Sequence, residues 1–182
     1  MRKVLFILGQ LSDSDADWLT RHGQRQRIAS GTTLIRHGTR ISTVYIILEG
    51  AFDVRSGRGL PLAVVGSGDI LGEMSLVDPG LTAASVIATQ DSLVLAVSRQ
   101  QLADQLQSDI GFAARFYRAL ALFLADRMRN TIGRLGYEAN PEAAALDVTA
   151  TPADADELDD NVLDTLHLAG ARFERMLKTL AG

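Results

Sequence analysis

The sequence predicts an α+β fold: an antiparallel β-roll or jelly roll with a leading helix, a long C-terminal helix and one added helix. Two observations carry this prediction. Between about residues 24 and 97, short β-branched runs alternate with Gly, Ser and Asp, as they do in antiparallel barrels and jelly rolls. Beyond residue 98, apolar residues recur every three or four positions, which is the period of a helix.

The first predicted helix runs from about residue 12 to residue 22. Ser12 or Ser14 can cap its start, and Gly23 can provide a left-handed stop at its end. Acidic side chains crowd the positive end of its dipole, namely Asp13, Asp15 and Asp17. These signals predict a capped helix that leads directly into the β region.

The strands are expected where β-branched and apolar residues cluster between turn signals. The clearest runs are residues 32–35, 43–48, 51–54, 60–65 and 93–97. Glu49-Gly50 separates two of these runs, and Gly allows the positive φ of a tight connection. The spacing favours neighbouring antiparallel strands.

Two helices are expected after the strands, at about residues 99–108 and 110–135, with Ser98 as the cap of the first. The second has an apolar stripe formed by Phe112, Phe116, Leu120, Leu124, Met128, Ile132 and Leu135. Every residue from Ala119 to Ala125 is apolar. We therefore expect this helix to be covered on all sides, by the β domain and by another helix or subunit.

The chain divides into three predicted segments: a domain at 1–136, a linker at 137–150 and a C-terminal helix at 151–182. Thr151-Pro152 suits a helix start. The helix has an apolar seam made of Leu158, Val162, Leu166, Ala169, Phe173, Met176 and Leu180. This seam suits either a short coiled coil or docking on the same chain's barrel or long helix.

Composition limits the classes of function. The chain has 182 residues, 47% of them hydrophobic, which is enough for one core, and a net charge of −4, which argues against nucleic acid or an anionic membrane as a partner. Residues 151–182 hold seven acidic and three basic residues, so this segment would repel DNA. The apolar run at residues 4–8 is too short for export or membrane insertion, so we expect a cytoplasmic protein.

Nothing in the sequence indicates catalysis. The chain has no Cys, and His22, His37 and His167 lie in separate predicted elements without metal-ligand spacing. Gly66-Ser67-Gly68 lacks the lysine and the following helix of a phosphate loop. We therefore expect neither an enzyme nor a metal site.

Residues 69–88 are the most informative stretch, reading Asp-Ile-Leu-Gly-Glu-Met-Ser-Leu-Val-Asp-Pro-Gly-Leu-Thr-Ala-Ala-Ser-Val-Ile-Ala. This order resembles the phosphate-binding cassette of cyclic nucleotide-binding domains. With the Leu48-Glu49-Gly50 turn and the flanking helices, about residues 5–136 resemble the effector domain of the catabolite activator protein family, protein kinase A regulatory subunits and cyclic nucleotide-gated channels. We expect no counterpart of the transcription factors' DNA-binding domain, because residues 151–182 are acidic and too short for a winged helix domain.

The resemblance implies a ligand, cyclic AMP or cyclic GMP, and a set of binding residues. Glu73 would accept the ribose 2′-hydroxyl, Gly72 would let the backbone approach, and amides from Glu73 to Leu76 would face the cyclic phosphate. The full predicted set is Gly72, Glu73, Met74, Ser75, Leu76, Thr82, Ala83, Ser85 and Thr131. Thr131 falls where a threonine reaches the base, although it equally suits a hydrogen bond to its own helix.

The family's phosphate-binding arginine falls at Thr82, which is followed by Ala83 and Ala84. Loss of such a charged hydrogen bond commonly costs about 1.5 to 3 kcal/mol, roughly ten- to a hundredfold in affinity. Three interpretations stay open: weak binding of an ordinary cyclic nucleotide, a different ligand, or a fold kept for its shape.

The function expected from the resemblance is that of a stand-alone regulatory or sensor domain. Ligand would organise residues 72–85, shift the long helix and so change a surface that binds a protein partner. By analogy, residues 112–135 would form a homodimer. The competing hypothesis is a ligand-independent interaction or assembly protein with a degenerate cassette.

Overall fold

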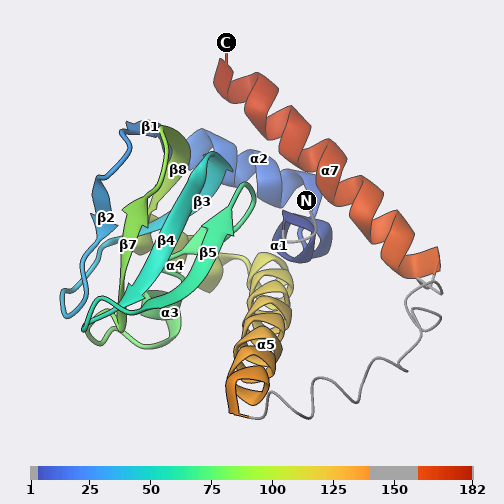
Figure 1. The fold of residues 1–182 in the computed structure, drawn as a ribbon. Coiled ribbons are helices and arrows are strands. Elements are labelled where there is room, and N and C mark those ends of the chain that lie inside the picture. The colour runs from blue at the N-terminus through green and yellow to red at the C-terminus, as the bar shows by residue number, and fades with distance from the viewer. Residues whose placement is uncertain (1–3, 140–159, 182) are drawn as a thin grey trace.

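The computed structural model describes residues 4–139 and 160–181. An eight-stranded β-roll lies beside a group of helices drawn from both ends of the chain (Figure 1). No helix within the described ranges is both long and apolar enough to cross a bilayer. The α+β fold class with antiparallel sheets is confirmed.

The roll consists of two four-stranded antiparallel sheets. The first has the order β1-β8-β3-β6 and the second β2-β7-β4-β5. The strands are β1 (Gly23–Ile28), β2 (Thr33–Ile35), β3 (Thr43–Glu49), β4 (Ala51–Ser56), β5 (Pro61–Gly66), β6 (Ile70–Leu71), β7 (Ala84–Ala88) and β8 (Ser92–Ser98). The inner faces of the two sheets enclose a shared core, in which Ile47, Phe52 and Val94 have no exposed surface.

The helices are α1 (Val4–Gln10), α2 (Asp13–His22), α3 (Met74–Val77), α4 (Arg99–Ser108), α5 (Ile110–Ala139) and α7 (Asp160–Ala181). Ser12, one of the two predicted caps, caps α2, and it also forms a capping box with Asp15. The predicted left-handed stop at Gly23 is wrong: its φ is −87°, and the chain passes straight into β1. Ser98 is the residue before α4, but its side chain makes no capping hydrogen bond.

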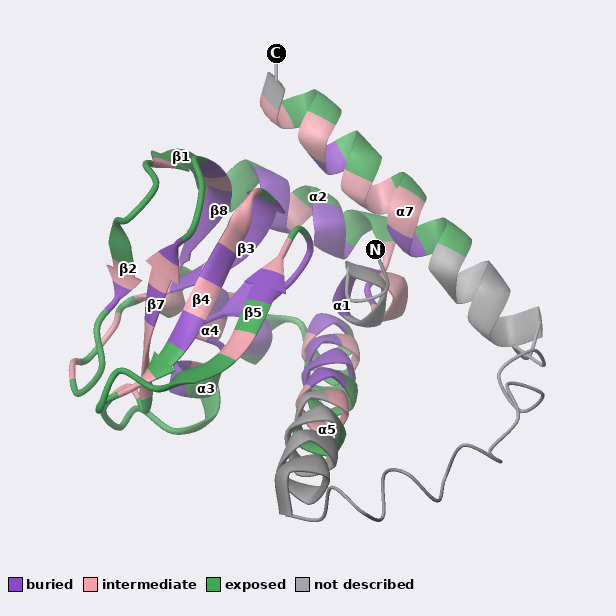
Figure 2. Cartoon of the chain, viewed as in Figure 1, coloured by how far each residue is buried: buried purple, intermediate pink, exposed green. Residues whose placement is uncertain are grey.

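Four helices, α1, α2, α5 and α7, form what we call the helical cluster. The α1 helix packs against both α5 and α7, and α2 packs against α7. Their shared core includes the fully buried Phe112 and Ala169 and the nearly buried Phe116 and Met176. Figure 2 shows this buried side of α5 facing α1. The last helix therefore docks on the same chain, mainly on α1 and α2, and its end also meets the barrel, where Arg25 of β1 donates to the Leu180 carbonyl at 2.6 Å.

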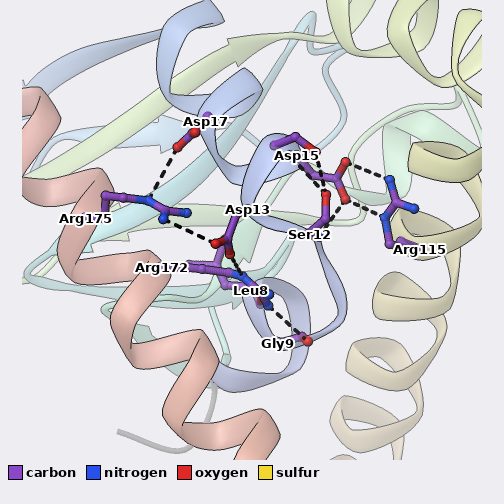
Figure 3. A network of polar contacts seen from close by, with 10 residues as sticks. Leu8, Gly9, Ser12, Asp13, Asp15, Asp17, Arg115, Arg172 and Arg175 are labelled. Atoms are coloured by element: carbon purple, nitrogen blue, oxygen red, sulfur yellow. Dashed lines mark hydrogen bonds and ion pairs between the residues drawn. The ribbon is translucent and has the colours of Figure 1, made fainter.

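Charged side chains fix the position of α7 (Figure 3). Arg172 donates to the Asp13 carboxylate at 2.6 Å and to the carbonyl oxygens of Leu8 and Gly9 at 2.9 and 3.4 Å. Those carbonyls belong to the last turn of α1, where a helix has no internal donors for them. Arg175 adds ion pairs to Asp13 and Asp17 at 3.4 and 3.5 Å. The α7 helix thus caps the end of α1.

A second charge pair joins α2 to α5. Arg115 donates to both carboxylate oxygens of Asp15, at 2.6 and 2.9 Å. Burial would raise the pKa of the Asp15 carboxyl, but hydrogen bonds from Arg115 and Ser12 together lower it below its usual value. Hydrogen bonds from Arg172 and Arg175 likewise lower the pKa of Asp13. Both carboxylates are therefore held in their charged form.

Among the described residues, α5 is covered mainly on one side. It packs against α1 and α4, while Tyr117, Leu122 and Met128 remain exposed. Complete cover was expected, and the β-roll does not provide it. The helix also runs beyond the predicted end, to Ala139, into the predicted linker at 137–150. The rest of that linker and the Thr151-Pro152 start lie outside the described residues.

Candidate ligand-binding site

The cassette, residues 69–88, contains β6, the single-turn helix α3 and β7. Its sharpest bend is at Gly72, whose φ is +79°. A Cβ atom there would lie 2.7 Å from Ile41 Cδ1 and 2.9 Å from the Thr43 carbonyl oxygen. Conformation and crowding both require glycine, so the backbone can pass close to β3 only with this residue.

Short hydrogen bonds hold the α3 turn in place. The Ser75 hydroxyl donates to the Gly72 carbonyl at 2.6 Å, and the Asp78 amide donates to the Met74 carbonyl at 2.8 Å. From the next helix, α4, Arg99 donates to the Ser75 carbonyl at 3.2 Å. The cassette is therefore linked directly to the helix that precedes α5.

A cavity of about 130 Å³ opens beside this turn. It is lined by Ile35, Ile41, Val54, Leu71, Gly72, Glu73, Met74, Ser75, Asp78, Gly80, Leu81, Thr82, Ala83, Ala84 and Val86. Most of the wall is apolar, and its charged members are Glu73, only 2% exposed, and Asp78. No basic side chain lines it among the described residues. The cavity thus offers acceptors for hydroxyl groups but no cation for a phosphate.

Thr82, at the position of the family's arginine, is bonded to the protein's own β2–β3 loop (residues 36–42). Its hydroxyl donates to the Arg36 carbonyl at 2.5 Å and accepts from the Thr39 amide at 3.1 Å. Its backbone adds two more bonds, from the Gly38 amide and to the Thr39 carbonyl, both 2.9 Å. The side chain that replaces the arginine therefore holds a loop in position.

The structure brings together most of the residues predicted to bind ligand. Gly72, Glu73, Met74, Ser75, Thr82 and Ala83 all line the cavity. Leu76 instead packs against the core, and the Ser85 hydroxyl accepts the amide of His37 at 2.9 Å. Thr131 belongs to α5, but its side chain is outside the described residues. Ligand contact by any of these residues stays a prediction.

Sequence reasoning missed the opposite wall of the cavity. Ile35 ends β2 and Ile41 lies in the β2–β3 loop, about thirty positions before the cassette. Neither belongs to a recognisable motif, so only the pairing of β2 with β7 could have indicated their place. Within the described residues, no group of three or more His, Asp or Glu side chains gathers as metal ligands do.

Comparison with known proteins agrees with this geometry. Residues 25–109 match the family model of the cyclic nucleotide-binding domain. The chain carries a domain of this family. The matched range includes the β-roll from β1 onward, the whole cassette and α4.

Proteins similar to the chain share this domain in different settings. An uncharacterized NTE family protein of Mycobacterium tuberculosis is 25% identical over 156 residues, which cover 82% of this chain and 27% of that protein. The cAMP-activated global transcriptional regulator Vfr of Pseudomonas aeruginosa is 28% identical over 145 residues, 75% of this chain and 64% of Vfr. The chain therefore spans about a quarter of the first relative and less than two thirds of the second.

A solved cyclic nucleotide-binding domain from Methylobacillus flagellatus has the same fold. It superposes with a TM-score of 0.67 at 23% identity, over 75% of this chain and 82% of that one. At this identity the likeness concerns the fold alone. The family match and the structural match thus indicate the same kind of domain, and neither identifies the ligand or the partner of this chain.

Proposed function

We propose that this chain is a non-enzymatic regulatory domain that binds a cyclic nucleotide in the cassette and transmits its occupancy to a partner surface on α5. The observation that carries the proposal is the buried Glu73, which lines the cavity beside the obligatory Gly72. A carboxylate held there is suited to accept hydrogen bonds from a sugar hydroxyl. The family relationship supports this role, whereas the ligand-independent assembly role is not favoured.

The remaining cavity wall suits the uncharged parts of a nucleotide. Ile35, Val54, Leu71 and Val86 present apolar surface that a ribose and base can cover. Met74 and Leu81 are 56% and 64% exposed at the rim, and a bound base would shield them from water. Ligand binding would therefore order the α3 turn and its flanking segments.

A continuous set of contacts links that turn to the rest of the molecule. Arg99 connects the Ser75 carbonyl to α4, α4 packs against α5, and Arg115 connects α5 to Asp15 on α2. A shift of α3 would thus displace α4 and, with it, α5. The exposed Tyr117 and Met128 are eleven positions apart on α5, about three helical turns, and so share one side that a second copy can cover; we propose a homodimer through residues 112–135.

Calorimetry with cyclic AMP and cyclic GMP tests the ligand. We expect saturable heat with the natural chain and a ten- to hundredfold weaker affinity with Glu73→Gln. Glu49→Gln, which changes an exposed acid at the end of β3, is the matched control and should bind normally. Absence of heat up to millimolar concentrations of both nucleotides would contradict the proposal.

Hydrogen exchange tests the coupling separately. With saturating nucleotide, amides in both α3 and α5 should exchange more slowly than in the free protein. Protection of α3 without any change in α5 would leave ligand binding intact and refute the transmission.

A cytoplasmic location, and the lack of nucleic acid or membrane partners, form part of the same proposal.

A further inference from the structure

We infer that Arg36 and Arg40, on the β2–β3 loop, supply the positive charge that the cassette lacks at Thr82 and so recognise the phosphate of the ligand. This inference rests on the proposed function, because it concerns how the same cavity holds an anionic nucleotide. It assigns phosphate recognition to a segment about thirty residues before the cassette. The evidence is the way in which the loop is attached to both sides of the cavity.

One end of the loop is attached at the position of the missing arginine. The Thr82 hydroxyl lies 2.5 Å from the Arg36 carbonyl oxygen, so the backbone of Arg36 is adjacent to that of Thr82. The Thr82 backbone also bonds to Gly38 and Thr39, which follow Arg36 in the same loop. A guanidinium on Arg36 can therefore serve the same region as an arginine at position 82.

The other end of the loop is attached at the first glycine of the cassette. Ile41 lines the cavity, and its Cδ1 atom lies 2.7 Å from the position that a Cβ on Gly72 would occupy. Arg40 is the preceding residue. The two arginines thus bracket the cavity, one beside Thr82 and the other beside the turn that leads into α3.

The loop is held rigidly between these points. The Thr39 hydroxyl donates to the Arg36 carbonyl at 2.7 Å, and the His37 amide donates to the Ser85 hydroxyl at 2.9 Å. Gly38 has a φ of +72°, which lets the chain turn within four residues. The backbone is therefore already ordered, and binding would have to order only the two arginine side chains.

Both arginines are available for an anion. They are exposed, and within the described residues neither meets a carboxylate at ion-pair distance. In contrast, Arg55, Arg115 and Arg172 each pair with an aspartate. The charged cavity-lining residues are both acidic, so a phosphate there needs a cation from nearby, and the fork of an arginine matches phosphate oxygens.

The test compares a charged ligand with a neutral one. Cyclic AMP and adenosine are titrated by calorimetry into the natural chain, Arg36→Gln, Arg40→Gln, the double glutamine variant and a double lysine variant. Arg27→Gln, at an exposed position on β1, is the matched control for loss of one charge. Thermal unfolding by circular dichroism verifies that each variant is folded.

We expect each single glutamine variant to weaken cyclic AMP about threefold to tenfold, and the double variant about ten- to a hundredfold. Adenosine should change by less than about twofold, because it has no phosphate. The double lysine variant keeps both charges, so it should keep most of the affinity for cyclic AMP. That affinity should still decrease as the salt concentration rises. Such a pattern would establish the loop as the source of the phosphate contact.

Two results would overturn the inference alone. One is a double glutamine variant that binds cyclic AMP as well as Arg27→Gln does, and the other is an equal loss for adenosine and cyclic AMP. If the natural chain binds no cyclic nucleotide at all, the proposed function fails and the inference fails with it. The natural chain's own titration therefore separates the two failures.

Discussion

Charged side chains attach α7 to the N-terminal helices, whereas neutral groups attach the cassette to the β2–β3 loop. In the helical cluster, Arg172 and Arg115 bridge between helices to aspartates, over a core that includes Phe112. In the cassette, the hydroxyls of Thr82 and Ser75 bond to nearby carbonyls. The attachments of the cluster combine charge pairs with a buried apolar core, whereas those of the cassette are neutral hydrogen bonds beside a cavity, so the cassette is the region that a ligand can rearrange at low cost.

The largest expected effect comes from the core of the helical cluster. Phe112 is fully buried and contacts Trp18 and Phe116. Phe112→Ala should lower the free energy of unfolding by about 3–5 kcal/mol, because it removes apolar burial and leaves a cavity. Urea unfolding followed by circular dichroism measures the loss. Tyr117→Ala, one turn away at an exposed position, should cost less than about 1 kcal/mol; equal losses would contradict the burial described for α5.

Breaking the pair between α2 and α5 should have the next largest effect. Asp15→Asn removes a buried charge from Arg115, and the expected loss is about 2 kcal/mol because Arg115 stays partly hydrated. The folded-state pKa of Asp15 is lowered, so its contribution is present above the unfolded value near 3.8 and is lost as the pH falls below it.

The pH dependence gives this prediction a second measurement. Unfolding free energy should decrease from about pH 5 downward in the natural chain, and less steeply in Asp15→Asn. Asp104→Asn, at an exposed position on α4, should follow the natural chain. An unchanged slope in Asp15→Asn would show that this carboxylate does not contribute to acid sensitivity.

The attachment of α7 should follow in size. Arg172→Met keeps the length and apolar stem of the side chain but removes its bonds to Asp13 and to the last turn of α1. We expect a loss of about 1–2 kcal/mol and faster hydrogen exchange in α1 and α7, with little change in the β-roll. Lys178→Met on the exposed side of α7 is the control. Faster exchange spread over the whole chain would mean that the cluster and the roll unfold together.

The smallest effect on stability is expected in the cassette. Thr82→Val keeps the shape of the side chain but removes both hydroxyl bonds to the β2–β3 loop, which costs about 1 kcal/mol. The same change should weaken cyclic AMP several-fold, because the loop loses its fixed position. Thr33→Val, an exposed threonine on β2, should change neither quantity. If Thr82→Val greatly lowered the free energy of unfolding but left the affinity for cyclic AMP unchanged, the cassette would be a stabilising region like the helical cluster, which would contradict the comparison.

The sequence predicted the parts of this molecule that carry local signals. A candidate cap at Ser12 or Ser14, followed by acidic residues, predicted α2, and the order of residues 69–88 predicted the cassette. The β1 strand was missed because four of its six residues are exposed polar ones at the edge of a sheet, so no alternation marks it. The seven-residue α1 was missed because so short a run shows no helical period.

Long-range attachments had no signal in the sequence. The apolar seam of α7 indicated that it packs, but its target depends on Arg172 meeting Asp13, which lies 159 positions earlier. The absence of an arginine at position 82 was visible, whereas the bonds from Thr82 to Arg36 and Thr39 depend on how two distant segments meet. Such contacts are set by the assembled fold rather than by local propensity.

The contact between Arg172 and the end of α1 affects the order in which the protein can fold during translation. The bond from Arg172 to the Leu8 carbonyl joins residues 164 positions apart. At a synthesis rate of about 5–20 residues per second, roughly 8 to 33 seconds separate the translation of these two residues. The β-roll can form during that interval, but one side of α1 stays uncovered until α7 has left the ribosome. The helical cluster can therefore be completed only after the whole β-roll has been synthesised.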